Sequence, residues 1–166
     1  MSKVSEIMAG VTPDPEYEGI ATNDDFILAI QTDESSQTTE KDYIVVQGGV
    51  TSHEATLNAE QAESQYIRTG KVTTKTTTQR QFAVSGDRME GDPFQKFVLD
   101  NKIKYGHGQK VVVNYVYFSM LTGIGEKGKV SIIVNEDQTG EAGENASFSV
   151  DLMGVGTPEN YTYSAA

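Results

Sequence analysis

The sequence predicts a mainly β protein: an antiparallel β-sandwich or barrel with one short flanking α-helix, an extended arm and an extended loop. Three observations predict this class. Short runs rich in β-branched and aromatic residues recur along the chain, residues 146–153 alternate between apolar and polar side chains, and only one segment has a strong helix start. A chain of 166 residues has the length of one domain, large enough for a core without covalent staples.

The expected strands lie in seven runs. Residues 109–118 are apolar on both faces and are therefore expected at the centre of the sheet. Residues 66–69 and 71–86 should form a hairpin, residues 123–128 a hairpin loop, and residues 135–140 a turn. The remaining strands are expected at 26–32, at 43–47 with a resumption from Val50 after the glycines, at 129–134 and at 146–153. In the last of these, Phe148, Val150 and Leu152 should face the core, and Ser147, Ser149 and Asp151 should face water.

The expected helix begins after Asp92, which is suited to the N-cap position. Pro93 suits the first helical position, and Gln95 would complete a capping box. The helix should run to about Lys102 and pack one apolar face, made of Phe94, Phe97 and Val98, against the sheet.

The chain divides into an N-terminal arm (1–22), a β domain (23–155) that includes a long loop at about 48–70, and a C-terminal tail (156–166). Residues 54–65 offer only Leu57 and small alanines as an apolar face. A helical turn is open to them by propensity, but a long exposed loop is the expectation. The threonine-rich run 72–84 is either an edge strand exposed on both faces or a strand completed by another chain.

The net charge of −11 is unevenly distributed. Residues 1–66 carry thirteen acidic and two basic side chains, whereas residues 67–110 carry nine basic and four acidic ones. This distribution argues against a broad basic face that binds nucleic acid. Two interpretations remain: a soluble protein with an acidic front, or complementary surfaces that favour head-to-tail assembly.

Sequence patterns that would indicate a catalytic, metal or cofactor site are weak. There is no cysteine, which excludes disulfides, thiolate metal sites and a cysteine nucleophile. His53 and His107 have no partner at metal-ligand spacing, and the acids of 87–92 lack the order of a calcium loop. The glycines of 123–128 match a dinucleotide fingerprint literally, but a β-branched run follows where a helix is needed. We expect no enzyme activity, no metal and no cofactor.

The sequence has no apolar run long enough to span a bilayer and no apolar leader at its start. We therefore expect a protein that folds in a cytoplasm and has no membrane partner.

A strand that ends before residue 47 is followed by the Gly-containing turn 47–52, the polar loop, the threonine-rich strand, and the segment 82–95 that leads into a short helix. The order of these segments resembles that of the major tail (tail tube) proteins of siphophages. The resemblance covers about residues 24–155. It implies a self-assembling virion protein whose six-membered rings stack into the tail tube, the conduit for DNA ejection, built in the host cytoplasm.

The resemblance also implies partners and surfaces. The partners would be other copies of the chain together with tail terminator, tape measure and distal tail proteins, while DNA passes without specific binding. Residues 1–22, residues 48–70 and the terminal segment 154–166 would bridge adjacent rings, with Glu54, Leu57, Glu60, Glu63 and Tyr66 in the bridging loop. Ser147, Ser149 and Asp151 are the candidates for the lumen wall. The alternatives are the inner tube of a contractile tail or bacteriocin, or a tail-associated β-rich binding module.

Overall fold

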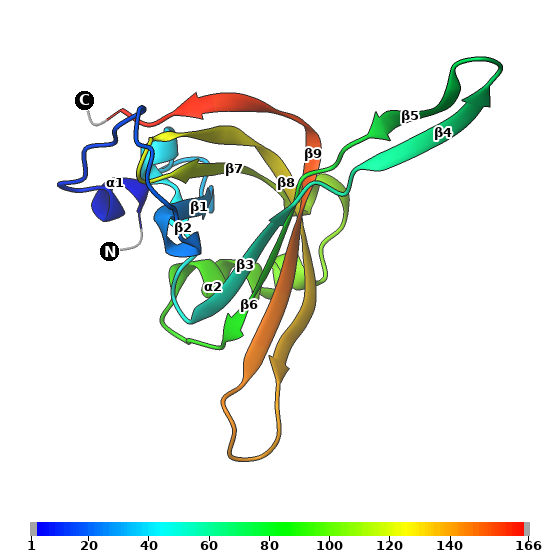
Figure 1. Cartoon of the computed structure of the whole chain (residues 1–166). Coiled ribbons are helices and arrows are strands. Elements are labelled where there is room, and N and C mark those ends of the chain that lie inside the picture. The colour runs from blue at the N-terminus through cyan, green and yellow to red at the C-terminus, as the bar shows by residue number, and fades with distance from the viewer. Residues whose placement is uncertain (1–2, 165–166) are drawn as a thin grey trace.

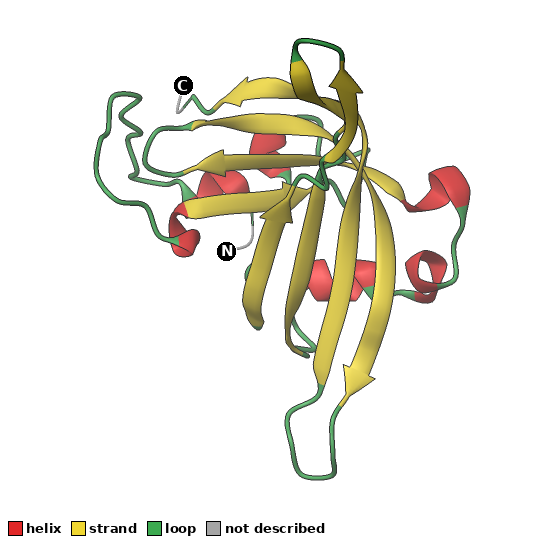
Figure 2. Ribbon diagram, turned by 45° about the vertical axis from the view of Figure 1, so that its right-hand side comes forward, coloured by secondary structure: helices red, strands yellow, loops and turns green. Residues whose placement is uncertain are grey.

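The computed structural model describes residues 3–164 and shows a curled, seven-stranded antiparallel sheet with a separate two-stranded hairpin (Figures 1 and 2). The strand order of the main sheet is β2-β1-β7-β8-β9-β6-β3. This mainly β, antiparallel architecture confirms the predicted fold class. The strands are β1 (Phe26–Ile30), β2 (Ile44–Val45), β3 (Val50–Thr56), β4 (Glu60–Tyr66), β5 (Gly70–Thr77), β6 (Gln81–Asp87), β7 (Val112–Ser119), β8 (Ile124–Thr139) and β9 (Ser147–Thr162).

The helices are all short. They are α1 (Val4–Ile7), α2 (Pro93–Val98) and α3 (Asn101–Lys104), with 3-10 turns η1 (Asn23–Asp25), η2 (Glu40–Asp42) and η3 (Gly108–Val111).

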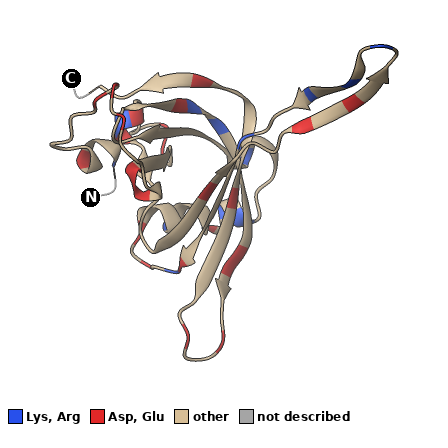
Figure 3. Cartoon of the chain, in the orientation of Figure 1, with Lys and Arg blue, Asp and Glu red and all other residues tan. Residues whose placement is uncertain are grey.

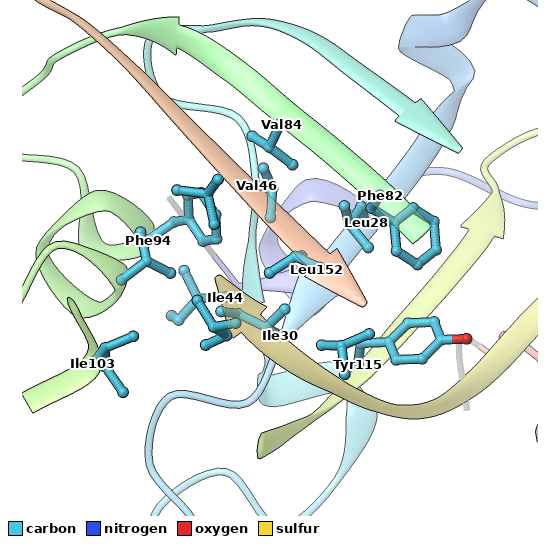
Figure 4. Packing of buried hydrophobic residues seen from close by; sticks show 14 of the residues in the cluster. Leu28, Ile30, Ile44, Val46, Phe82, Val84, Phe94, Ile103, Tyr115 and Leu152 are labelled. Atoms are coloured by element: carbon cyan, nitrogen blue, oxygen red, sulfur yellow. The ribbon is translucent and has the colours of Figure 1, made fainter. Parts of the chain in front are cut away.

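The main core fills the concave side of the curled sheet (Figure 4). The predicted inward residues of β9, Phe148, Val150 and Leu152, are at most 1% exposed. They pack with the inward side chains of β6 and β7 and with Phe94 of α2, which covers this side of the sheet. The strand β7 lies between β1 and β8, as its apolar sequence predicts.

The start of α2 is fixed locally, but its end and its capping box differ from the prediction. The Asp92 side chain accepts a hydrogen bond from the backbone N–H of Gln95 at 3.1 Å. The Gln95 side chain does not return to the cap; it is fully buried and donates to the carbonyl of Gly48 at 2.7 Å. The helix ends at Val98, and Asp100 caps the separate helix α3, so the expected continuous helix to Lys102 is wrong.

A second, smaller core lies on the opposite side of β1 and β7. The residues Val4 and Met8 of the N-terminal segment are buried there, at 0% and 2% exposure, against Val116 and Phe118. Part of the predicted arm is therefore packed, because its apolar side chains cover a sheet face that would otherwise be exposed. Residues 1–2 of that arm lie outside the described residues.

Both ends of the β8–β9 pair extend further than predicted. The strand β9 continues to Thr162, so residues 156–162 of the predicted tail belong to the sheet, and Tyr163 after it is buried. The expected turn at 135–140 is mostly strand, since β8 runs to Thr139. The predicted hairpin loop at 123–128 is confined to its start, because β8 begins at Ile124. Residues 165–166 of the tail are outside the described part.

The largest correction concerns residues 48–70. The expected loop contains β3, which is the edge of the main sheet, and β4, which pairs with β5. The predicted turn at Thr69 and Gly70 is at the tip of this hairpin, where Arg68 and Gly70 adopt positive φ angles of 72° and 82°. The predicted continuous strand 71–86 is two strands, β5 and β6, because residues 78–80 interrupt it.

Candidate assembly surfaces

The β4–β5 hairpin projects away from the body of the protein (Figure 1). All seven residues of β4 are exposed, and so is every residue of β5 except the half-buried Gly70. The two strands pair only with each other. An isolated two-stranded hairpin is marginally stable in water. The hairpin is therefore a segment with the geometry of a sheet and no core of its own.

The two faces of this hairpin differ chemically. Because paired residues of an antiparallel ladder share a face, the register separates Glu63, Lys71 and Lys75 from Tyr66 and Val72. On the polar face Lys71 forms an ion pair with Glu63 at 2.8 Å. On the other face Tyr66 is 55% exposed and Val72 40% exposed, and Ile67 at the tip is 90% exposed. This second face is the more suitable one for contact with another chain.

The root of the hairpin is fixed to the body by hydrogen bonds and an ion pair. The backbone N–H of Gln79 donates to the carbonyl of Leu57 at 2.8 Å, and that of Gly154 donates to the carbonyl of Arg80 at 2.6 Å. The Arg80 guanidinium lies 2.8 Å from Glu126 and over the rings of Phe82 and Tyr117. The direction of the hairpin is thus set by the folded subunit.

A second surface is the face of β3, β6, β9 and β8 that is turned away from the main core. Apart from Ile133, which is 46% exposed, the strand register places small and acidic side chains there, all of them partly or fully exposed. The stretches that form it, 52–54, 83–87, 133–136 and 147–151, contain no Lys or Arg (Figure 3). We call it the small-acidic face; its residues are Ser52, Glu54, Ala83, Ser85, Asp87, Ile133, Glu136, Ser147, Ser149 and Asp151.

The residues predicted from the sequence divide between these two surfaces. Ser147, Ser149 and Asp151 lie together on the small-acidic face, with Asp151 accepting a hydrogen bond from the Asn135 amide at 2.9 Å. Glu54 lies on the same face rather than in a loop. The other predicted bridging residues belong to the hairpin: Leu57 at its root, and Glu60, Glu63 and Tyr66 in β4.

The apolar face of the hairpin was not predicted from the sequence. Its signal is weak but present: Ala62, Ser64 and Tyr66 alternate with Gln61, Glu63 and Gln65. Val72 and Ile67 complete that surface.

The described residues 3–164 contain no group of three or more His, Cys, Asp or Glu side chains placed to hold a metal ion. No helix in the same range has the length and apolar character of a membrane span.

The titratable groups with shifted pKa values have structural explanations. Burial lowers the pKa of His53, whose ring meets Tyr117 edge-on at 6.4 Å. Burial also raises the pKa of Asp92, although backbone hydrogen bonds to its carboxylate oppose the shift. His53 lies beside Asp24, and both line a pocket at the sheet edge, whereas Asp92 caps α2.

No family model matches the sequence, and no curated protein matches it. Solved structures do match its fold. A chain from the tail of an empty gene transfer agent particle with C6 symmetry superposes with a TM-score of 0.58 at 13% identity, covering 87% of this chain and 100% of that one. A chain from the virion of a native gene transfer agent gives a TM-score of 0.58 at 11% identity over 86% and 100% of the two chains.

The tube-terminating cap of an anti-feeding prophage gives a TM-score of 0.55 at 10% identity, over 90% of this chain and 96% of that one. These identities are low, so the likeness concerns the fold. The sequence resemblance and the structural likeness agree: the chain has the tail tube-like fold that it shares with chains of these tail and tube-cap assemblies.

Proposed function

We propose that this protein is a structural tail subunit that assembles with copies of itself into six-membered rings, and that these rings stack into the tail tube of a virion. The β4–β5 hairpin carries the proposal. It is a rigidly rooted, two-stranded element with exposed apolar side chains and no core, so its stable environment is the surface of another subunit. The likeness to a tail particle chain of C6 symmetry supports six copies per ring.

In this proposal, the small-acidic face lines the lumen, with Ser147, Ser149 and Asp151 near its centre. The face is a continuous β surface without a basic side chain among the stretches that form it. A basic wall would hold the DNA backbone through its phosphates, whereas small and acidic side chains leave the passing polyanion free. The role of the protein is therefore conduction and assembly rather than catalysis.

Electron microscopy and sedimentation of the purified protein test the assembly. We expect rings at low concentration and stacked tubes at high concentration. A protein that stays monomeric across concentration and salt would overturn the proposal.

The lumen assignment has its own test. Ser149→Lys should leave tubes intact but make them bind DNA fragments at low salt, because each ring gains six positive charges on the inner wall. The matched control is Thr38→Lys, which adds the same charge in an exposed loop. Equal DNA binding by the two variants would show that Ser149 does not face the lumen.

The likeness to a tube-terminating cap favours one second candidate, a subunit that closes the end of a tube. A cap would form rings that bind one end of a preformed tube and would not lengthen by themselves. Elongation into long tubes from the purified chain alone distinguishes a tube subunit, including the inner tube of a contractile tail, from a cap.

A further inference from the structure

An open hollow of about 790 Å³ lies beside α3. Its apolar part is made by Phe97, by Ile103, which is 8% exposed, and by Tyr105, which is 74% exposed. Tyr105 thus stands at the side of the hollow with most of its ring in water. Exposed aromatic surface of this kind, next to a concavity, is typical of a contact site for another protein.

The rim of this hollow is basic. Lys102 and Lys110 line it, and both are exposed. Within the described residues 3–164, neither forms an ion pair, whereas Lys104 is held by Asp137 at 3.0 Å. The one acid on the rim, Asp100, already accepts a hydrogen bond from the backbone N–H of Lys102 as the cap of α3. The hollow therefore fits an apolar side chain that is flanked by carboxylates.

The chain itself contains such a segment in the N-terminal loop, residues 12–20. Tyr17 is 45% exposed and lies between the exposed carboxylates of Glu16 and Glu18. The loop is held in place at its base, because the backbone N–H of Asp14 donates a hydrogen bond to the carbonyl of Leu121 at 2.8 Å. Ile20, at 93% exposure, adds apolar surface next to Tyr17.

The loop and the hollow lie at opposite edges of the subunit (Figures 1 and 2). The loop after α1 is at the left of both views, and the helical segment that follows α2 is at the right-hand edge of Figure 2. A subunit therefore cannot fill its own hollow with its own loop. Two complementary surfaces on opposite edges produce a head-to-tail contact that every copy can repeat.

We propose that Tyr17 enters the hollow beside α3 of a neighbouring copy, where Glu16 and Glu18 face Lys102 and Lys110. The partner is a second copy of this chain, and the inference rests on the proposed self-assembly. It adds a contact that is independent of the β4–β5 hairpin, made by a defined acidic-aromatic segment and a defined basic hollow. It also accounts for the uneven distribution of charge along the sequence, because the acidic N-terminal part of one copy would lie against the basic middle part of the next.

Reciprocal charge reversal tests the contact. Lys102→Glu with Lys110→Glu should raise the concentration needed for assembly by about tenfold or more, and so should Glu16→Lys with Glu18→Lys. The protein that carries all four changes should return to within a few-fold of the natural chain, because the charges are again complementary. All four positions are exposed, so circular dichroism should show unchanged folding. A fourfold variant that assembles no better than the weaker double variant would overturn the proposal.

Disulfide trapping gives a second readout, which is clean because the chain has no cysteine. A chain with Tyr17→Cys and Tyr105→Cys should form a ladder of cross-linked oligomers on oxidation. A mixture of the two single variants should stop at dimers that contain one of each, because each copy then offers one half of the contact. The control pairs Tyr17→Cys with Ala142→Cys at the exposed tip of the β8–β9 hairpin and should give no ladder.

The two proposals fail in different ways. If the natural chain assembles but neither the ladder nor the rescue by charge reversal is found, this contact is wrong and self-assembly stands. If the natural chain remains monomeric at every concentration, both proposals fall.

Discussion

Replacing the β4–β5 hairpin by a short turn should separate folding from assembly. The design replaces residues 59–78 by one glycine, so that the chain reads Leu57-Asn58-Gly-Gln79. The backbone N–H of Gln79 already donates to the carbonyl of Leu57 at 2.8 Å, and Asn58 already has a φ of 43°. An Asn-Gly pair inside such a hydrogen-bonded pair forms the two-residue turn that joins antiparallel strands.

The effect on folding should be small. The removed strands bury no side chain in either core, and their hydrogen bonds are to each other. The contacts at the root remain, including the hydrogen bond from the Asn58 amide to Gln81 at 2.8 Å. We expect the free energy of unfolding to change by less than about 1 kcal/mol, as for surface changes away from the core.

The effect on assembly should be large. Tyr66 is 55% exposed, Ile67 90% and Val72 40%. The apolar surface that these three side chains could bury is therefore nearly that of two fully exposed side chains. Burying one such side chain is worth about 1.5–3 kcal/mol, so docking the hairpin contributes about 3–6 kcal/mol per subunit before entropic costs. At about 1.4 kcal/mol for each factor of ten, the concentration needed for assembly should rise about a hundredfold or more.

Urea unfolding followed by circular dichroism measures the first quantity, and light scattering with electron microscopy across a concentration series measures the second. The matched control is Lys75→Ser, which alters the polar face of the hairpin and leaves the apolar face intact. Tubes that form from the shortened chain at the same concentration as from the natural one would refute the role of the hairpin. A chain that no longer folds would refute the claim that the hairpin is independent of the core.

Three further predictions concern the body of the subunit. Asp92→Ala should lower the free energy of unfolding by about 1 kcal/mol in a urea titration, because α2 loses its N-cap, while Asp92→Asn, which can still cap, should cost less. Arg80→Met should cost about 1–3 kcal/mol, since Glu126, which is 24% exposed, loses its cation, and an unchanged melting temperature would contradict this. Burial lowers the pKa of His53, with Asp24 opposing, so the unfolded chain takes up its proton first as the pH falls below about 6.5. Stability should therefore fall with pH from there down through the folded-state pKa, and His53→Gln should flatten that slope in unfolding curves measured at several pH values.

The elements that the sequence predicted well depend on local physics. The inward and outward alternation in β9 and the central position of β7 follow from side-chain periodicity, which the fold preserves. The Asp92 cap could be predicted for the same reason, because a cap involves only the three or four residues that follow it. The hydrogen bond of the Gln95 side chain could not be predicted, since its partner Gly48 is 47 residues away in sequence.

The strand β4 and the second half of β3 were missed because residues 54–65 have a composition unsuited to burial, although a strand resuming from Val50 was expected. Glu, Gln and Ala are poor strand formers, and their strand geometry here is imposed by the partner strands β5 and β6. The far ends of β8 and β9 were missed for a related reason: beyond the core their side chains are polar, and only the pairing of the two strands keeps them extended. The N-terminal segment was assigned to an arm because the sheet face that buries Val4 and Met8 cannot be seen from residues 1–22 alone.

The absence of a core in the β4–β5 hairpin also has an evolutionary consequence. Most substitutions are filtered first by whether the chain still folds, because natural proteins lie just above the stability that they need. Substitutions in residues 60–77 should have little effect on folding, since the side chains of these residues do not pack against the body of the protein. In the proposed assembly, selection on mutations there acts almost wholly through the partner subunit that the hairpin contacts. Two related subunits made in the same cell could therefore diverge at this hairpin alone and stop mixing, with the rest of each chain unchanged.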